Sequence, residues 1–352
     1  MRILYINYIN TSSLSSGSSV RPARIQQAFL DAGHELILLT GDQFSRQRLN
    51  NINKAKQLIK VKRPDLCYIE SPTYPIVRYA DRNFIKFIHK QGIPIGYFYR
   101  DFYLKFPEYF PRKKGLLRSL KNLVLDYLQH LTDKVLYKCD IVYFPTDSAA
   151  NMFNYTNKKT LPPAGIARFN KFKKYNHTGI YVGGITGPYD IKPLLEAYNN
   201  LHMNDDSYRL ELVCRKSEWD NFNSAFKNAS WLSVHHLSGE DIVPLYEKSS
   251  IAFVMPDKSN KYNDLAISVK LFEYISYGLP VIAVNTISLK SIITKYNLGI
   301  SVNPNHIDLI NAIHTILRSQ DIYKEYRTKV CDSLIKYHLW SHRVDTIIKD
   351  LG

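Results

Sequence analysis

The chain has 352 residues, of which 45% are hydrophobic, and its 47 Lys and Arg against 31 Asp and Glu give a formal net charge of +16. This length and composition exclude a disordered or low-complexity protein and predict two globular domains. The positive excess predicts an anionic partner, such as phosphate groups, acidic lipid or nucleic acid, without distinguishing among them.

The sequence shows no sign of a targeting segment or a metal centre. No apolar run reaches the roughly 20 residues that a membrane-spanning helix needs. The start, MRILYINYIN, indicates a first strand and not a signal peptide. We expect reduced thiols in a cytoplasmic protein, because the cysteines have neither CxxC pairs nor metal-ligand spacing. We also expect no metal and no cofactor, since no histidine set or DxD-type carboxylate pair is present.

The first half of the sequence alternates between strand and helix patterns. We expect helices from Pro22 to Gly33, at 51–62, at 77–90 and at 113–138. Strands are predicted at 2–8, 35–39, 65–70, 93–99 and 141–144. This alternation predicts a parallel sheet with helices on both faces.

A basic segment with paired prolines, residues 161–177, is predicted to link two domains, 1–160 and 178–337. A second alternating series follows it, with strands expected at 179–184, 209–214, 231–237, 251–255 and 299–302, and helices at 190–202 and 218–227. The last helix, 338–352, is expected to pack back onto the first domain. We predict an α/β protein with two doubly wound domains facing each other across a cleft, with ligands at the carboxyl ends of the strands.

The stretch VKLFEYISYGLPVIAV, residues 269–284, places Glu273 inside an apolar run. The pattern predicts a helix from Ser268 and a strand after Gly278. The first amides of such a helix carry partial positive charge and favour a phosphate, and Lys270 adds a cation to the first turn. Glu273 is then placed to accept hydrogen bonds from ribose hydroxyls. The alternative is a surface ion pair between Glu273 and Lys270 at i, i+3.

This stretch resembles the donor-site signature of retaining, GT-B-fold glycosyltransferases of family four. It is most similar to the bacterial capsule, O-antigen and exopolysaccharide branch with a KLFEY…G.PVI pattern. In the wider family two glutamates stand eight positions apart, and the second, which contacts the nucleotide ribose, falls on Glu273. The first falls on Leu265, with Asp264 beside it, so the chain departs from the pattern. Members of the branch generally lack that glutamate, and the departure leaves open how the donor sugar is held.

The stretch YVGGITGPYDIKPLLEA, residues 181–197, is similar to the family's opening of the nucleotide domain. Its two glycines allow a diphosphate to approach backbone amides closely. The lysine common to this loop in the family falls near Tyr189 and is absent. We expect cations after the next strand to replace it as phosphate clamps, the alternative being a solvated basic loop. The candidate donor-binding residues are Gly183, Gly184, Arg215, Lys216, Ser268, Lys270, Leu271 and Glu273.

Two N-terminal segments extend the resemblance. SSGSSVRPARIQQAF, residues 15–29, resembles the family's glycine turn after the first strand and supplies the candidate acceptor-binding residues Gly17, Ser18, Ser19 and Arg21. Ordinary turn chemistry is the alternative there. YFYRDFYLKFPEYF, residues 97–110, is similar to the branch's RD.WP segment. Asp101, with Arg100 beside it, is the catalytic candidate, which binds a hydroxyl or acts as a base; the alternative is a structural Arg–Asp pair.

The stretch RKKGLLRSLKNLVLDYL, residues 112–128, combines an apolar helical stripe with clustered cations. A basic amphipathic helix can lie in an anionic membrane surface. The alternative is a stripe that faces the core beneath solvated cations. The resemblance favours membrane contact, with the candidate residues Arg112, Lys113, Lys114 and Arg118.

The resemblance implies a retaining glycosyltransferase of cell-surface polysaccharide synthesis. Residues 180–300 would hold a hexose-type nucleotide-diphosphate sugar, UDP-linked, and residues 1–150 a glycan or lipid-linked acceptor, at the inner face of the cytoplasmic membrane. Cations and helix dipoles would stabilise the leaving diphosphate without a metal. The alternatives are a sugar-nucleotide epimerase of the same fold and a non-enzymatic basic protein that binds membrane or nucleic acid. No nucleic-acid motif is present, and we expect no nucleic-acid partner.

Overall fold

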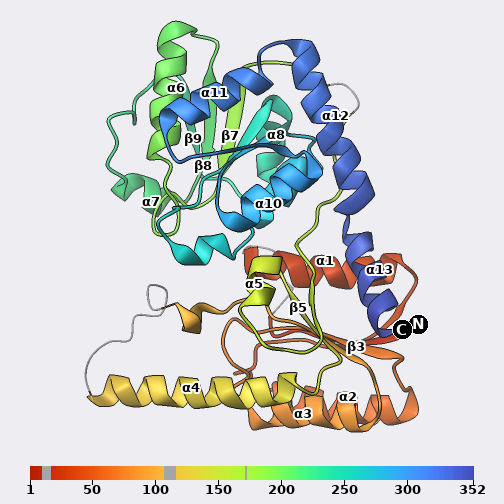
Figure 1. The fold of residues 1–352 in the computed structure, drawn as a ribbon. Coiled ribbons are helices and arrows are strands. Elements are labelled where there is room, and N and C mark those ends of the chain that lie inside the picture. Colours follow the sequence, from red (N-terminus) through yellow and green to blue (C-terminus); the bar gives the residue numbers. More distant parts are fainter. Residues whose placement is uncertain (10–16, 107–115, 171–172) are drawn as a thin grey trace. The chain divides into compact units, whose positions relative to one another are not determined.

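The computed structural model describes residues 1–9, 17–106, 116–170 and 173–352 (Figure 1). The chain divides into two compact units. Unit 1 comprises Met1–Pro162 and Trp340–Gly352, and unit 2 comprises Pro163–Leu339. Each unit is an α/β layer structure with its own parallel sheet.

Unit 1 contains a six-stranded parallel sheet in the order β2-β1-β3-β4-β5-β6. Its strands are β1 (Arg2–Ile6), β2 (Glu35–Leu39), β3 (Leu66–Glu70), β4 (Ile95–Phe98), β5 (Ile141–Phe144) and β6 (Lys158–Thr160). β1 lies inside the sheet, where Ile3 pairs with Leu36 on one side and Leu66 on the other. The five predicted strands are confirmed, whereas β6 was not predicted, because its sequence KKT has no apolar residue.

Helices cover both faces of this sheet. α1 (Gly17–Asp31) and α13 (Trp340–Leu351) pack against each other on one face, while α2 (Arg48–Val61), α3 (Tyr79–Lys90) and α4 (Leu116–Leu136) line the other, below the strands in Figure 1. The short α5 (Asp147–Asn151) follows β5. The helical period explains the packing of α3: Phe84, Ile85 and Ile88 are buried against the sheet, and Lys86 and Lys90 point outward.

Unit 2 contains a second six-stranded parallel sheet in the order β12-β11-β10-β7-β8-β9. Its strands are β7 (Thr178–Val182), β8 (Arg209–Val213), β9 (Leu232–His235), β10 (Ile251–Val254), β11 (Val281–Val284) and β12 (Gly299–Val302). Each coincides with a predicted strand, and the central strands β7, β10 and β11 are fully buried, as is typical of a parallel sheet covered on both faces.

The helices of unit 2 form one layer on each side of the sheet. They are α6 (Lys192–Asn204), α7 (Lys216–Asn221), α8 (Val243–Lys248), α9 (Val269–Ser276), α10 (Ile287–Tyr296), α11 (His306–Ile316) and α12 (Gln320–Tyr337), with short 3-10 turns at Gly239–Ile242 and Lys261–Asp264. Successive side chains of β7 point to opposite faces of the sheet, so this strand packs against the helices on both sides. Tyr181 joins the apolar cluster that includes α6 and α11, and Ile180 and Val182 join the cluster that includes α8, α9 and α10.

Two local predictions differ from the structure. Helix α1 begins at Gly17, ahead of Pro22, whose carbonyl oxygen accepts a hydrogen bond from the hydroxyl of Tyr5. The segment expected to be a linker packs on unit 2 from Pro163 onward: Gly165 bridges to Leu339, and the N–H of Arg168 donates to the carbonyl of Ser276 at 2.8 Å. These contacts could not be predicted from the basic composition of the segment, because they are made through backbone atoms.

Candidate functional site

The predicted donor residues lie on three segments that meet at one edge of the unit 2 sheet. Gly183 follows β7, Arg215 follows β8, and Ser268 precedes α9, the helix between β10 and β11. The carboxyl ends of parallel strands share an edge, and in open α/β sheets this edge is where ligands bind. The chain therefore brings the predicted glycine turn, cations and helix start to the same side of unit 2.

Helix α9 begins where the sequence predicts. Ser268 is its N-cap residue, and the Ser268 hydroxyl oxygen accepts a hydrogen bond from the N–H of Lys270 at 3.2 Å. Gly278, with φ of +66°, ends the helix in a left-handed conformation that favours glycine. The helix presents its positive N-terminal end at the carboxyl edge of the sheet.

Glu273 lies on the outer side of α9 and not inside its apolar run. Its carboxylate accepts a hydrogen bond from Lys270 Nζ at 2.7 Å, and the Glu273 and Lys270 side chains are 33% and 35% exposed. The i, i+3 pair that was the alternative interpretation is thus present. Leu271, in contrast, is fully buried, and its N–H donates to the carbonyl of Ser268. The side chain of Leu271 therefore supports the core, and its donor contact stays a prediction.

The glycine turn after β7 is covered by an aromatic ring. A Cβ atom at position 184 would lie 2.9 Å from the ring of Tyr189, so glycine is needed there for this contact. The N–H of Gly183 donates to the carbonyl of Val213, and the N–H of Ile185 donates to Glu218 Oε2 at 2.8 Å. The amides of Gly183 and Ile185 are thus engaged by the protein itself.

The two predicted clamp cations each pair with a carboxylate of α7. Arg215 Nη1 lies 2.6 Å from Glu218 Oε1, and Lys216 Nζ lies 3.0 Å from Asp220 Oδ2. Their side chains are 80% and 71% exposed. Such exposed pairs are weak, about 0–1 kcal/mol, so an incoming anion can replace the carboxylates.

In unit 1, the Arg–Asp pair predicted after β4 is present. Arg100 Nε donates to Asp101 Oδ2 at 2.8 Å, and a second guanidinium nitrogen donates to the hydroxyl of Thr73 at 2.6 Å. Both charged side chains are 13% exposed. Asp101 also lines a small cavity of about 30 Å³ together with Tyr99 and Gln129, which is room for about one water molecule.

Arg21 is held inside unit 1. It is buried, its Nε donates to Glu70 Oε1 at 3.0 Å, and its Nη1 donates to the carbonyls of Leu161 and Pro162. The guanidinium also lies over the ring of Phe98, 3.5 Å from its centroid. The charge of Arg21 is thus satisfied inside unit 1, and its acceptor role stays a prediction.

The other predicted acceptor residues belong to the first turn of α1. Ser19 is buried with 2% exposure. Gly17 and Ser18 begin the helix, and the side chain of Ser18 lies outside the described part of the chain.

Three of the predicted membrane residues, Arg112, Lys113 and Lys114, lie outside the described residues, as does the side chain of Arg118 in α4. The described part of α4 shows where its apolar stripe faces. Four residues of the stripe are between 50% and 65% exposed: Leu120, Leu123, Val124 and Tyr127. The stripe turns into the core only near the end of the helix.

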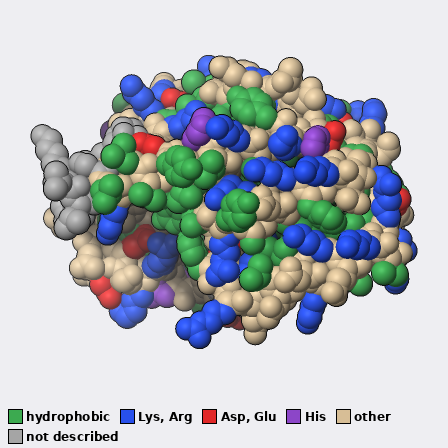
Figure 2. Space-filling model, turned by 90° about the horizontal axis from the view of Figure 1, so that it is seen from below, with side chains coloured by type: hydrophobic (Ala, Val, Ile, Leu, Met, Phe, Trp, Pro, Cys, Tyr) green, Lys and Arg blue, Asp and Glu red, His purple; other side chains and the backbone are tan. Residues whose placement is uncertain are grey.

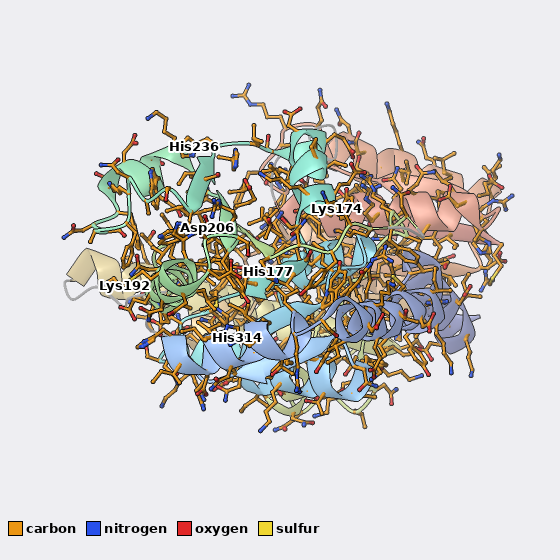
Figure 3. The ribbon with its side chains drawn as sticks, turned by 90° about the horizontal axis from the view of Figure 1, so that it is seen from above. Lys174, His177, Lys192, Asp206, His236 and His314 are labelled. Carbon is orange, nitrogen blue, oxygen red and sulfur yellow. The ribbon has the colours of Figure 1, made fainter. Side chains whose placement is uncertain are left out.

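A large hollow of about 1050 Å³ lies elsewhere on unit 2. It is lined by Tyr175, His177 and Tyr208, which precede or begin β7 and β8, and by His314 on α11 (Figure 3). His177 and Tyr208 stack with ring centroids 4.4 Å apart. The hollow is therefore at the amino ends of the strands, opposite to the predicted donor edge.

Within the described residues, no group of three or more His, Cys, Asp or Glu side chains could hold a metal ion. Cys67, Cys139, Cys214 and Cys331 are all buried free thiols. No helix in the part of the chain that the structure describes is both long and apolar enough to cross a membrane.

Comparisons with known proteins identify the fold. Residues 192–349 match a family described as "Glycosyl transferase-like". An α-glucosyltransferase in complex with UDP is similar over 100% of this chain and 99% of its own, at 13% identity and a TM-score of 0.64. WaaG, a glycosyltransferase involved in lipopolysaccharide biosynthesis, is similar over 99% and 100%, at 15% identity and a TM-score of 0.60. The chain has the GT-B fold.

The same fold also occurs in an isomerising enzyme. A UDP-GlcNAc 2-epimerase from Methanocaldococcus jannaschii covers 99% of this chain and 99% of its own, at 10% identity and a TM-score of 0.54. No curated protein sequence matches the chain. At such identities the structural likeness shows the GT-B fold alone.

The predicted donor edge contains groups that the sequence analysis missed. Glu218 joins the β7 turn to Arg215, and Lys258, after β10, donates to Asn285 Oδ1 at 2.5 Å after β11. Asp264 Oδ1 accepts from the N–H of Ile287 and so caps α10. The i, i+3 spacing of Arg215 and Glu218 was visible in the sequence, but the contact with residue 185 depends on the tertiary fold.

Proposed function

We propose that the protein is a glycosyltransferase that moves a sugar from a UDP-sugar to a hydroxyl acceptor. The observation that carries the proposal is the carboxyl edge of unit 2, where the N-terminus of α9, the exposed Lys270–Glu273 pair and the β7 glycine turn come together. The match of residues 192–349 to a glycosyl transferase-like family and the UDP bound to an α-glucosyltransferase of this fold support the same reading.

The donor diphosphate would lie at the start of α9. There the helix dipole and the cations Lys270, Arg215 and Lys216 offset the negative charge that builds on the leaving group. Glu273 would exchange its pairing with Lys270 for hydrogen bonds to the ribose hydroxyls, which its one-third exposure permits. The proposal includes no metal, because these positive groups supply the stabilisation.

The acceptor would be bound by unit 1. Asp101 would accept the proton of the attacking hydroxyl or position it, and the pairing with Arg100 fixes the orientation of its carboxylate. By resemblance we further propose a hexosyl transfer with retention of configuration, to a glycan or lipid-linked acceptor, in bacterial capsule or exopolysaccharide synthesis.

We also propose that the enzyme acts as a peripheral protein at the inner membrane face, docked through the outer surface of α2, α3 and α4. The only carboxylate of α2 and α3, Asp81, is buried, whereas both helices expose lysines. Figure 2 shows this side of the molecule, with Lys and Arg side chains spread among hydrophobic ones. Exposed Leu123 and Tyr127 of α4 would enter the interface of an anionic bilayer.

One experiment separates transfer from epimerisation, the alternative raised by the epimerase of the same fold. The purified protein is screened by thermal shift against a panel of nucleotide sugars, and the stabilising donor is incubated with membrane extract or glycan acceptors. Transfer releases UDP and labels the acceptor. An isomerised nucleotide sugar without UDP release would identify an epimerase, and the absence of any nucleotide binding would refute both.

A further inference from the structure

Glu218 pairs with a backbone amide of the β7 glycine turn and with Arg215, one of the cations that the proposed site assigns to the donor diphosphate. Its Oε2 accepts a hydrogen bond from the N–H of Ile185 at 2.8 Å, and its Oε1 accepts one from Arg215 at 2.6 Å. The Glu218 side chain is 16% exposed, whereas that of Arg215 is 80% exposed. The carboxylate thus lies inward, between the glycine turn after β7 and the cation after β8.

This arrangement imitates an anion complex. A turn amide and a guanidinium that converge on two oxygens of one anionic group are the donors with which proteins bind phosphate. Oε2 would also lie 3.5 Å from a Cβ at position 184, which places the carboxylate directly against the glycine that the diphosphate is expected to approach. A diphosphate and Glu218 therefore compete for the same donors, since like charges that share one site repel.

The neighbouring Tyr189 closes the same turn. Its ring lies on Gly184, and its backbone bridges to Pro256 at the end of β10. In this arrangement a carboxylate engages one amide of the turn and an aromatic ring covers one of its glycines. Glu218 belongs to α7, a helix of six residues that directly follows Arg215.

We propose that Glu218 is an anionic placeholder: it holds the diphosphate clamp assembled in the free protein and is displaced when the nucleotide sugar binds. The inference rests on the proposed donor site and adds a residue that tunes its affinity. Glu218 keeps Arg215 and the β7 turn aligned, and it also weakens nucleotide binding by competition. The sign of its effect on affinity is therefore opposite to that of a residue that contacts the ligand.

The test is calorimetric titration of the full chain with UDP and with uridine, comparing the parent with Glu218→Gln. The variant retains a hydrogen-bond acceptor for Ile185 but loses the competing charge. We expect UDP to bind about fivefold more tightly, the scale of one partly exposed ion pair, and uridine, which has no phosphate, to bind equally. Glu218→Ser, which also removes the charge, is expected to change UDP affinity in the same direction.

Glu325→Gln is the matched control, because it removes one negative charge from an ion pair with Lys329 on α12. Its UDP affinity should equal that of the parent. Unchanged or weaker UDP binding by both Glu218 variants, with the parent binding UDP, would overturn the placeholder and leave the donor site standing. If parent and variants all fail to bind UDP, the proposed function fails and the placeholder falls with it.

Discussion

Removal of the Glu273 carboxylate separates a structural role from a ligand-binding role. In the structure Glu273 contacts Lys270 at 2.7 Å, and both side chains are about one-third exposed. An intrahelical pair of this kind contributes about 0.2–0.5 kcal/mol to helix stability. We therefore expect Glu273→Ala to lower the free energy of unfolding by less than about 1 kcal/mol.

The same change should affect nucleotide binding more strongly. A carboxylate that accepts hydrogen bonds from ribose hydroxyls contributes about 1.5–3 kcal/mol, because a bond to a charged group is stronger than a neutral one. We expect Glu273→Ala to weaken UDP binding by about 1–3 kcal/mol, or roughly fivefold to 150-fold. The loss should be equally visible with uridine, since the predicted contact is to the sugar and not to the phosphates.

Urea unfolding and calorimetry measure the two quantities on the same preparation. Glu325→Ala, which breaks the i, i+4 pair with Lys329 on α12, is the matched control and should leave both affinities unchanged. A folded Glu273→Ala protein with parental affinity for UDP would refute the ribose contact. A loss seen with UDP but not with uridine would show that Glu273 acts on the phosphate end through Lys270.

Three further outcomes are expected. Asp81→Asn should cost about 3–5 kcal/mol of stability in urea unfolding, because it strands the buried Arg48 that Asp81 contacts at 2.9 Å; a loss below 1 kcal/mol would contradict this. Burial lowers the pKa of Lys173 to about 7. At pH values between this pKa and the ordinary pKa of lysine, the unfolded chain binds more protons than the folded chain. The free energy of unfolding of the parent, relative to that of Lys173→Met, should therefore rise from pH 7 to pH 10. A difference that stays flat or falls over this range would count against a buried amine. Lysine-to-glutamine changes on α2 and α3 should each reduce co-sedimentation with phosphatidylglycerol vesicles by about fivefold. The same number of changes on unit 2 should have no effect. Equal vesicle binding by the two sets of variants would remove α2 and α3 from the docking surface. The first set is Lys54, Lys60, Lys86 and Lys90, and the control set is Lys192, Lys227, Lys290 and Lys324.

The sequence was sufficient for all strands except β6 because each of the others contains a short run of mainly apolar residues. β3, β5, β7 and β11 are buried along their whole length, and their β-branched and aromatic residues identify them without tertiary information. The start of α9 was equally predictable, since Ser268 and Gly278 act locally at the two ends of the helix. The edge strand β6, with no apolar residue, had no such signal.

Side-chain partners were less predictable, because they come from distant parts of the chain. The sequence around Arg21 contains no signal that its side chain is buried. Its partner Glu70 becomes adjacent only when α1 packs over β3. Glu218 likewise meets Ile185 only through the pairing of β7 with β8. A sequence pattern identifies a cation near a predicted ligand edge, but it does not identify the carboxylate that forms an ion pair with that cation in the fold.

Exposure separates the two kinds of ion pair in this protein. Arg21–Glu70 and Arg48–Asp81 are at most 4% exposed on either side, and a ligand cannot replace one partner without leaving a buried charge uncompensated. The pairs at the donor edge, Arg215–Glu218 and Lys270–Glu273, each have at least one partner that is a third or more exposed. Their cations can change partners at little cost. The proposed nucleotide binding at this edge requires such exchange, and the weakness of these pairs is compatible with it, whereas the buried pairs of unit 1 hold its helices on the sheet.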